Sequence, residues 1–227
     1  MALQTSRYTF LATQEKGKVS ALLLKPENPE FLLVLGHGAG AGMEHDSMEN
    51  IAQAMATHGI ASLRYQFPYM ERGGGRDSQA VSLETVTSAV QFAHQLEPNL
   101  PLLAGGHSFG GRMTSLAAAQ DMIPTVKGLI FCSFPLHAPG KPGIERAGHL
   151  PDIKVPMLFL SGTRDTFLNL DLFMPLLENI RHHATLHLLD TANHGYKILK
   201  RTRKSEEDVF AEMGRVAGEW VREKLKL

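Results

Sequence analysis

This sequence of 227 residues has one cysteine, no net charge and no long apolar run, and each of these features argues against a class of protein. The one cysteine, Cys132, excludes a disulfide within the chain; it lies in the apolar segment 129–132, where we expect it to be a buried core residue. Lys and Arg number 23, as do Asp and Glu, so the charge gives no indication of a nucleic-acid or anionic-membrane partner. No apolar run approaches a membrane span, and the first seven residues lack the apolar centre of a signal peptide. We therefore expect a cytoplasmic protein.

The chain is long enough, at 43% hydrophobic residues, to bury one sizeable core, and we expect residues 1–227 to form a single domain. The first two predicted strands form a hairpin. The later ones are short apolar runs that alternate with helical stretches, which is typical of strands buried on both faces of a parallel sheet. The predicted strands span residues 7–13, 19–24, 31–35, 60–65, 101–104, 128–132, 156–160 and 185–189.

Three of the intervening segments carry apolar residues at helical spacing, and we expect each apolar stripe to face the sheet. They span 48–56, 83–93 and 209–220, and Ser205 is a predicted cap for the third helix. The segment between Cys132 and Pro156 is too short for a helical cap domain. The sequence therefore predicts an α/β protein with a mostly parallel, twisted sheet, helices on both faces, and a minimal cap or none.

The motif Gly-His-Ser-Phe-Gly at 106–110 lies between a predicted strand and a predicted helix. In that context the pattern Gly-x-Ser-x-Gly is typical of a nucleophile elbow, in which a strained serine stands on a tight turn at the positive end of a helix. Glycines such as Gly106 and Gly110 leave room for that turn. We expect Ser108 to be a catalytic nucleophile.

A serine nucleophile needs a base that takes its proton and an acid that orients the base. Asp165 follows a predicted strand and His194 lies in the loop after the last one, so the chain has the expected order of serine, acid and histidine. Loops at the carboxyl ends of parallel strands meet at one edge of a sheet, where these residues can converge. Asp190, at the edge of its strand, and Asp152, which precedes its strand, are the alternative acids.

Two backbone amides are expected to stabilise the oxyanion of such a reaction. One belongs to Phe109, directly after the predicted nucleophile. The other is expected in the glycine-rich segment 36–43, where glycine lets the backbone approach a substrate closely. Ala39 is the predicted donor there, with Gly40 as the alternative.

Three further residues are candidates for contact with a substrate. Gly40 and Met43 belong to the glycine-rich segment, and Arg112 lies one helical turn past the predicted nucleophile. For Arg112, packing beneath the site is the favoured alternative to binding a substrate carboxylate. The basic run 197–204 is followed at once by acidic residues, which indicates a solvated lead-in to the last helix.

The glycine-rich segment also fits a dinucleotide-binding fingerprint through Gly36, Gly38 and Ala41. That motif requires an acid about 20 residues further on, and the chain has none at 63–66. Three histidines near the last strand could be imagined as metal ligands, but no cluster of carboxylates or thiols supports a metal site. They are His182, His183 and His187.

Four segments together resemble the α/β-hydrolase-like family related to testis-expressed protein thirty and to subunit three of the NSL chromatin complex, and more distantly the dienelactone hydrolases. They are Gly-Ala-Gly-Ala-Gly-Met-Glu-His at 38–45, Leu-Arg-Tyr-Gln-Phe-Pro-Tyr-Met-Glu at 63–71, Gly-Gly-His-Ser-Phe-Gly-Gly-Arg-Met at 105–113 and Gly-Thr-Arg-Asp at 162–165.

The resemblance implies an α/β-hydrolase fold and a catalytic triad of Ser108, Asp165 and His194. It implies no substrate, because Ser108 stands where dienelactone hydrolases have a cysteine. Asn193 stands where such relatives typically have an acid, directly before the histidine.

We therefore predict a serine hydrolase that cleaves a carboxylic ester or thioester through an acyl-enzyme, with no cofactor and no metal. Its expected partner is a small-molecule ester, and a protein partner or a homo-oligomer is left open. The alternative is a non-catalytic interaction module with the same fold. A dinucleotide-binding protein is a lesser alternative.

Overall fold

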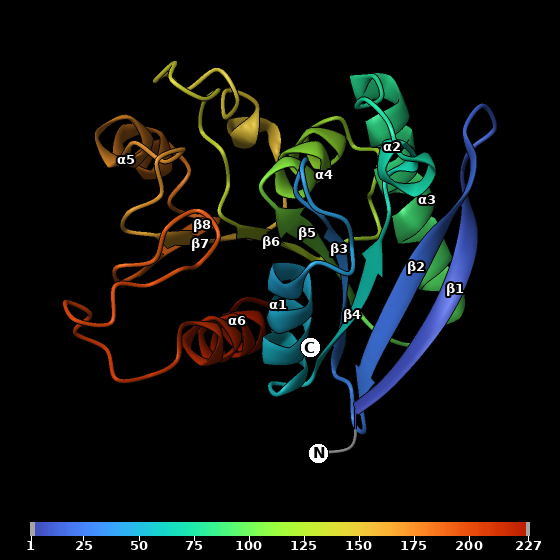
Figure 1. Cartoon of the computed structure of the whole chain (residues 1–227), viewed down its shortest axis with the longest axis horizontal. Helices are drawn as coiled ribbons and strands as arrows, with labels where there is room; N and C mark the ends of the chain where they lie inside the picture. Colours follow the sequence, from blue (N-terminus) through green and yellow to red (C-terminus); the bar gives the residue numbers. More distant parts are fainter. Residues whose placement is uncertain (1–2, 226–227) are drawn as a thin grey trace.

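An eight-stranded sheet of order β1-β2-β4-β3-β5-β6-β7-β8 runs through the computed structural model, which describes residues 3–225 (Figure 1). β1 and β2 form an antiparallel hairpin, β2 and β4 are antiparallel, and the remaining neighbouring pairs are parallel. The predicted, mostly parallel sheet is thus confirmed. The strands are β1 (Leu3–Thr13), β2 (Gly17–Pro26), β3 (Phe31–Gly36), β4 (Ile60–Tyr65), β5 (Leu102–His107), β6 (Gly128–Cys132), β7 (Met157–Gly162) and β8 (Ala184–Leu189).

The central strands are continuous apolar runs because both of their faces are covered. β3, β4, β6 and β7 consist of buried residues throughout, and Cys132 at the end of β6 is buried as predicted. In the edge strand β8, by contrast, Leu189 alone is buried.

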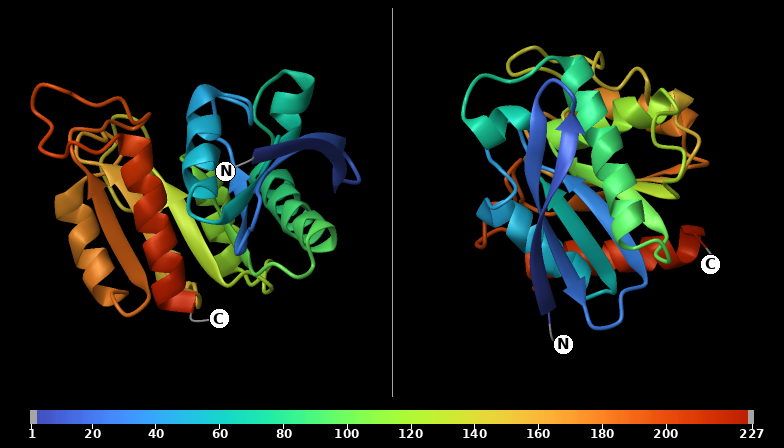
Figure 2. Two further views of the ribbon diagram at one scale, coloured as in Figure 1. Left: turned by 90° about the horizontal axis from the view of Figure 1, so that it is seen from below. Right: turned by 90° about the vertical axis from the view of Figure 1, so that its right-hand side faces the viewer.

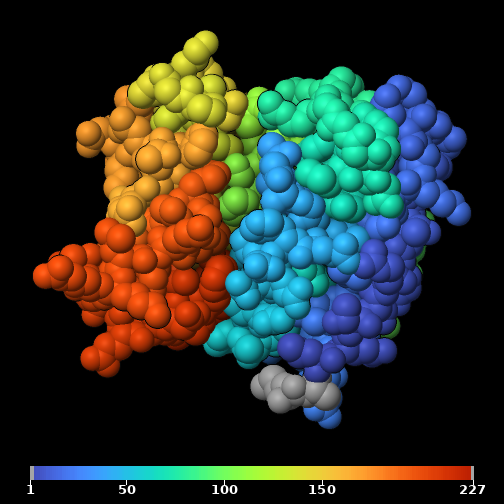
Figure 3. Space-filling model, in the orientation of Figure 1, coloured from blue at the N-terminus to red at the C-terminus, as the bar shows by residue number. Residues whose placement is uncertain are grey.

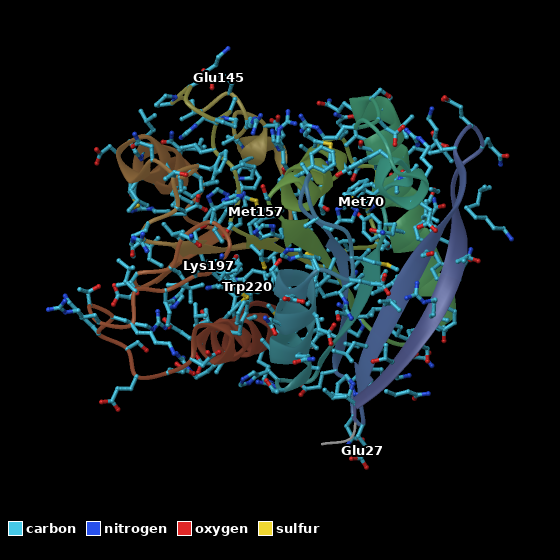
Figure 4. All side chains as sticks on the ribbon, in the orientation of Figure 1. Glu27, Met70, Glu145, Met157, Lys197 and Trp220 are labelled. Atoms are coloured by element: carbon cyan, nitrogen blue, oxygen red, sulfur yellow. The ribbon has the colours of Figure 1, made fainter. Side chains whose placement is uncertain are left out.

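Two layers of helices cover the two faces of the sheet (Figure 2). On one face, α1 and α6 pack together, and their stripes form a core with alternate strand residues. Trp220 lies between α6 and the sheet, against Gly128 of β6 (Figure 4). On the other face, α3, α4 and α5 cover a second core. The helices are α1 (Asp46–Ala56), α2 (Pro68–Arg72), α3 (Gln79–Leu96), α4 (Phe109–Ala119), α5 (Leu170–Asn179) and α6 (Val209–Leu225), with a 3-10 turn at Leu150–Asp152.

The predicted cap of the last helix is wrong. α6 begins at Val209, and Asp208 caps it, since its Oδ1 accepts hydrogen bonds from the amides of Phe210 at 2.9 Å and Ala211 at 3.2 Å. Ser205 instead accepts a hydrogen bond from the amide of Glu207 in the preceding loop. This loop projects from one side of the molecule (Figure 3).

Within residues 3–225, no large cap covers the carboxyl ends of the strands. The segment between β6 and β7 contains an isolated bridge between Ala138 and Lys141 and the short 3-10 turn. In Figure 3 this yellow segment gathers at one edge of the face that is shown. Among the helices of residues 3–225, none is long and apolar enough to cross a membrane.

Candidate active site

Ser108 stands on the turn between β5 and α4 in a backbone conformation that side chains rarely adopt, with φ 51° and ψ −108°. Its amide donates a hydrogen bond of 2.9 Å to the carbonyl oxygen of Cys132, at the end of the neighbouring strand β6. The surrounding sheet therefore holds the strained turn in place, as a nucleophile elbow requires.

The two glycines of the motif are needed for close backbone packing. A Cβ atom at Gly106 would lie 2.4 Å from the carbonyl oxygen of Gly36, and one at Gly110 would lie 2.3 Å from the same oxygen. Both contacts are with backbone atoms of β3, which cannot swing aside. The elbow thus packs directly against the strand that leads into the glycine-rich segment.

The structure joins Ser108, His194 and Asp165 in one chain of hydrogen bonds. Nε2 of His194 lies 2.9 Å from Oγ of Ser108, and Nδ1 of His194 lies 2.9 Å from each carboxylate oxygen of Asp165. The Asp165 side chain is fully buried, whereas that of His194 is 23% exposed. Oδ1 of Asp165 also accepts a hydrogen bond from the amide of Phe167 at 2.9 Å. The carboxylate is therefore fixed, and the imidazole lies between it and the hydroxyl.

The loops that carry the acid and the histidine are bound to each other. The amide of Thr163 donates to Leu189 at 3.1 Å, and that of Arg164 donates to Ala192 at 2.9 Å. In return, the amide of Thr191 donates to Oγ1 of Thr163 at 2.9 Å. These contacts explain how residues from β7 and β8 meet with a fixed separation.

Asn193 shapes the turn that presents the histidine. Its Oδ1 accepts hydrogen bonds from the amides of Gly195 at 3.0 Å and Lys197 at 2.9 Å. A carboxylate would offer the same acceptor, so the amide side chain at this position preserves the turn. Lys197 follows it in the loop after β8 (Figure 4).

The two predicted oxyanion donors lie on segments that are tied together. Within residues 3–225, neither the Phe109 amide nor the Ala39 amide donates a hydrogen bond to another protein group. The neighbouring amide of Gly110 donates to the carbonyl oxygen of His37 at 3.0 Å, and the carbonyl oxygen of Ala39 accepts from the Tyr69 hydroxyl at 3.0 Å. Two free donors are thus held beside Ser108.

His37 anchors the glycine-rich segment, a role that the sequence analysis missed. Its Nδ1–H donates to the carbonyl oxygen of Gly38 at 2.7 Å, and its Nε2 accepts from the amide of Phe67 at 3.0 Å. Burial lowers the pKa of His37 to about 4, which keeps the ring neutral and able to do both.

His107 is a second neutral histidine, and it contacts the loop of His194. Its Nε2–H donates to the carbonyl oxygen of His194 at 2.9 Å. Burial lowers the pKa of His107 to about 4. The structural roles of His37 and His107 were not predicted, because in the sequence both residues stand out only as neighbours of glycines.

Two cavities meet at Ser108. The first, which we call the arginine cavity, has a volume of about 410 Å³ and is lined by Ser108, Phe109, Phe167 and three arginines, Arg76, Arg112 and Arg146. The second, the histidine cavity, has a volume of about 320 Å³ and is lined by Ser108, His107, His194 and Lys197. Ala39 and Gly40 line both cavities.

Of the three residues predicted to contact a substrate, two line the cavities and one does not. Gly40 lines the cavities, and Arg112 lines one of them, although packing was the favoured interpretation for it. Met43 is 1% exposed and lines neither cavity, so its side chain is a core residue rather than a substrate contact. Arg76 belongs to an exposed glycine-rich loop and Arg146 to the segment after β6, and nothing in their local sequence places them beside Ser108.

A second serine–histidine contact lies deeper in the molecule. Oγ of Ser115 donates to the carbonyl oxygen of Arg112 at 2.8 Å and lies 2.7 Å from Nε2 of His149. Ser115 is fully buried in α4, so no substrate can reach its hydroxyl. This pair is a packing contact and serves as a comparison for Ser108.

The alternative acids and the histidines considered as metal ligands have other roles in the structure. Asp190 accepts a hydrogen bond from the amide of Lys204, and Asp152 lies in the 3-10 turn. In the described part of the chain, no group of three side chains could hold a metal ion. His187 instead bonds to Glu212 of α6. The hypothesis of a dinucleotide site also loses support. In that motif the glycines lead directly into a helix, whereas α1 begins only at Asp46, beyond Ala41.

Comparison with known proteins gives a consistent match. Residues 29–222 match the model of the protein family described as an alpha/beta hydrolase domain. The fold is similar to Est1E from Butyrivibrio proteoclasticus, with 17% identity, a TM-score of 0.74, and 97% of this chain and 99% of that one covered.

Two further solved structures have the same fold. One is a dienelactone hydrolase from Anabaena variabilis, with 16% identity, a TM-score of 0.72, and 97% of this chain and 99% of that one covered. The other is a serine hydrolase without a lid from Xanthomonas campestris, with 16% identity, a TM-score of 0.73, and 97% and 94% covered. The narrower resemblance to testis-expressed protein thirty stays a prediction.

Proposed function

We propose that this chain, which belongs to the alpha/beta hydrolase domain family, hydrolyses a carboxylic ester or thioester with Ser108 as nucleophile. The observation that carries the proposal is the chain of hydrogen bonds from Ser108 through His194 to Asp165, each link 2.9 Å long. A hydroxyl, an imidazole and a fixed carboxylate in that order are the groups that nucleophilic acyl transfer needs.

In the first step, His194 Nε2 takes the proton of the Ser108 hydroxyl while Oγ forms a bond to the carbonyl carbon. The carbonyl π electrons move to its oxygen, where the amides of Phe109 and Ala39 donate to the developing negative charge. Asp165 stabilises the imidazolium and keeps its Nδ1–H oriented. The positive end of α4 points at the same place.

In the second step, the tetrahedral intermediate collapses. Its carbon–oxygen or carbon–sulfur bond to the leaving group breaks, and that group takes the proton from His194 Nε2. An acyl-enzyme remains. Water then attacks the acyl carbon, gives a proton to His194, and releases the acid as Ser108 regains its proton.

The surrounding residues support this chemistry. His37 and His107 are neutral, so neither adds a positive charge that would oppose protonation of His194. The loss of one oxyanion donor typically costs about 3–4 kcal/mol in the transition state, which makes the anchoring of the Ala39 segment by His37 important. The strand ends carry no large cap in the part of the chain that the structure describes, which suits a small or surface-presented ester. We further propose a cytoplasmic location, which cell fractionation would test.

Hydrolysis of p-nitrophenyl acetate by matched serine variants tests the proposal. Ser108→Ala should lower kcat by about three to six orders of magnitude, the range found when triad members are removed. Ser115→Ala, which removes a buried serine that contacts a histidine, should retain activity. Equal rates in wild type and Ser108→Ala would remove Ser108 from the mechanism. A folded wild type that hydrolyses no ester would favour the interaction module instead.

A further inference from the structure

Three arginines converge on the arginine cavity from separate parts of the chain. Arg112 comes from α4, one turn past Ser108; Arg76 comes from the loop before α3, and Arg146 from the segment between β6 and β7. No acidic residue of the described chain lines this cavity. Its charge is therefore strongly positive in a protein whose overall charge is zero.

None of the three guanidinium groups forms an ion pair with a carboxylate of residues 3–225. Arg146 donates to the carbonyl oxygen of His137 at 3.1 Å, and Arg76 lies over the ring of Phe109 at 5.8 Å. Nε of Arg112 is buried without a hydrogen-bond partner. The two acids adjacent to these arginines in sequence do not pair with them: Glu145 turns its carboxylate against Gly143 at the outer edge of the molecule (Figure 4), and Asp77 pairs with Arg72.

The arginines also disfavour one another's charge. Burial lowers the pKa of Arg112, and the nearby Arg146 and Arg76 lower it further. Burial and Arg76 likewise lower the pKa of Arg146. Unpaired like charges at a partly buried site cost free energy, which an anion in the cavity would recover. Guanidinium groups match a carboxylate especially well because they donate two parallel hydrogen bonds.

The two cavities are suited to different parts of an ester, the leaving group and the acyl chain. The leaving group must receive its proton from Nε2 of His194, so it belongs in the histidine cavity, which His194 lines. Among the described residues, the arginine cavity is lined by the proposed oxyanion donor Phe109 and not by His194, whereas the other proposed donor, Ala39, lines both cavities. The acyl chain that extends from the carbonyl carbon therefore points towards the arginines.

We propose that the arginine cavity binds a carboxylate at the far end of the acyl group, so that the substrate is a half-ester or half-thioester of a short dicarboxylic acid. This rests on the proposed function, because it assumes that Ser108 forms the acyl-enzyme. A cavity of about 410 Å³ accommodates a short acyl chain with its terminal carboxylate.

Three esters, followed by pH-stat titration, separate charge from shape and position. Monoethyl glutarate carries its carboxylate on the acyl side, and ethyl 5-methylhexanoate has a neutral branched end of the same shape. In 3-butanoyloxypropanoate the carboxylate lies on the alcohol side. We expect kcat/KM for monoethyl glutarate to exceed that of the neutral ester about tenfold to a hundredfold, and to fall steeply with ionic strength. The alcohol-side anion should show no such preference.

Arginine variants assign the preference to the cavity. In Arg112→Gln and in the more exposed Arg76→Gln, the ratio of kcat/KM for monoethyl glutarate to that for the neutral ester should fall about tenfold or more. Arg181→Gln is the matched control, since Arg181 is exposed and pairs with Glu178 away from the cavity; its ratio should equal that of wild type. An unchanged ratio in both cavity variants, or a preference for the alcohol-side anion, would overturn the proposal.

A binding measurement keeps this inference separate from the proposed function. Calorimetry with Ser108→Ala should show monoethyl glutarate binding more tightly than the neutral ester, and Arg112→Gln in that background should remove the difference. If wild type hydrolyses neutral esters through Ser108 but shows no charge preference, the inference fails and the proposed function stands. If no ester is hydrolysed but the charge-dependent binding is present, the proposed function fails and the anion site stands.

Discussion

His107 links the two segments that flank Ser108: its Nε2–H donates to the carbonyl oxygen of His194 over 2.9 Å, and its Nδ1 would lie 2.9 Å from a Cβ atom at Gly38. It therefore positions the histidine loop against the glycine-rich segment without touching the Ser108 hydroxyl. We predict that His107→Ala lowers kcat for p-nitrophenyl acetate about tenfold, because the loop loses a buried hydrogen bond worth about 1–2 kcal/mol.

His107→Gln, whose amide can donate in the same direction, should recover part of this loss. The readout is kcat against KM, since a positioning residue should affect kcat more than KM. If the Ala and Gln variants lose kcat equally, the hydrogen bond to His194 is not what matters at this position.

Asn193 offers a second test of how the histidine is presented. Asn193→Ala removes the acceptor for the amides of Gly195 and Lys197, and we predict a fall of about tenfold in kcat/KM because the turn loses two hydrogen bonds. Asn193→Asp keeps an acceptor in the same place and should stay close to wild type. Steady-state kinetics on one ester measures both, and a larger loss in the Asp variant than in the Ala variant would contradict the turn's role.

Most of the fold could be predicted because buried parallel strands are continuous apolar runs. β4 and β6 coincide with the predicted segments 60–65 and 128–132, and the flanking glycines mark the turn at Ser108. The start of α6 could not be predicted. Ser205 and Asp208 are both good caps, and the choice between them depends on where the loop packs, which local sequence does not encode.

The basic run before α6 illustrates the same limit. It was expected to be solvated, yet the Arg203 side chain is 3% exposed and pairs with Glu212, which also bonds to His187. We predict that Arg203→Met lowers the free energy of unfolding by about 3 kcal/mol or more, since it leaves a buried carboxylate with one fewer partner. Chemical denaturation measures this.

Arg201→Met is the control, because Arg201 lies in the same loop and is exposed. It should change the unfolding free energy by no more than about 0.5 kcal/mol. Similar small effects in both variants would mean that the buried ion pair contributes little to folding.

Stability should depend on pH through the neutral histidines. Burial lowers the pKa values of His37, His107 and His149 to about 4, whereas in an unfolded chain they lie near 6.5. Between these values the unfolded state binds more protons, so the free energy of unfolding should fall as pH falls from about 6.5 to 4. The full effect of one such histidine is about 1.4 kcal/mol per pH unit.

His149→Gln isolates part of this dependence, since glutamine can still donate to Ser115. The slope of unfolding free energy against pH should become shallower, by less than the full value because His149 is only partly buried. The exposed His94 supplies the control, and His94→Gln should leave the slope unchanged. Equal slopes in all three proteins would mean that His149 protonates as easily in the folded state as in the unfolded one.

The candidate site divides into a part that the sequence shows and a part that only packing creates. Ser108, Asp165 and His194 follow strand ends, so their convergence follows from sheet topology. Arg76 and Arg146 lie in loops whose paths are set by tertiary contacts, and no local pattern distinguishes them from other surface arginines.

The activation of Ser108 by His194 is the claim on which the proposed chemistry depends, and covalent trapping tests it most directly. Wild-type protein and the variants Ser108→Ala, His194→Ala and Ser115→Ala would be treated with a fluorophosphonate, and the modified peptide would be located by mass spectrometry. We predict one adduct on Ser108 in wild type and in Ser115→Ala, greatly slowed labelling in His194→Ala, and none in Ser108→Ala. An adduct on a different serine, or equal labelling rates with and without His194, would contradict it.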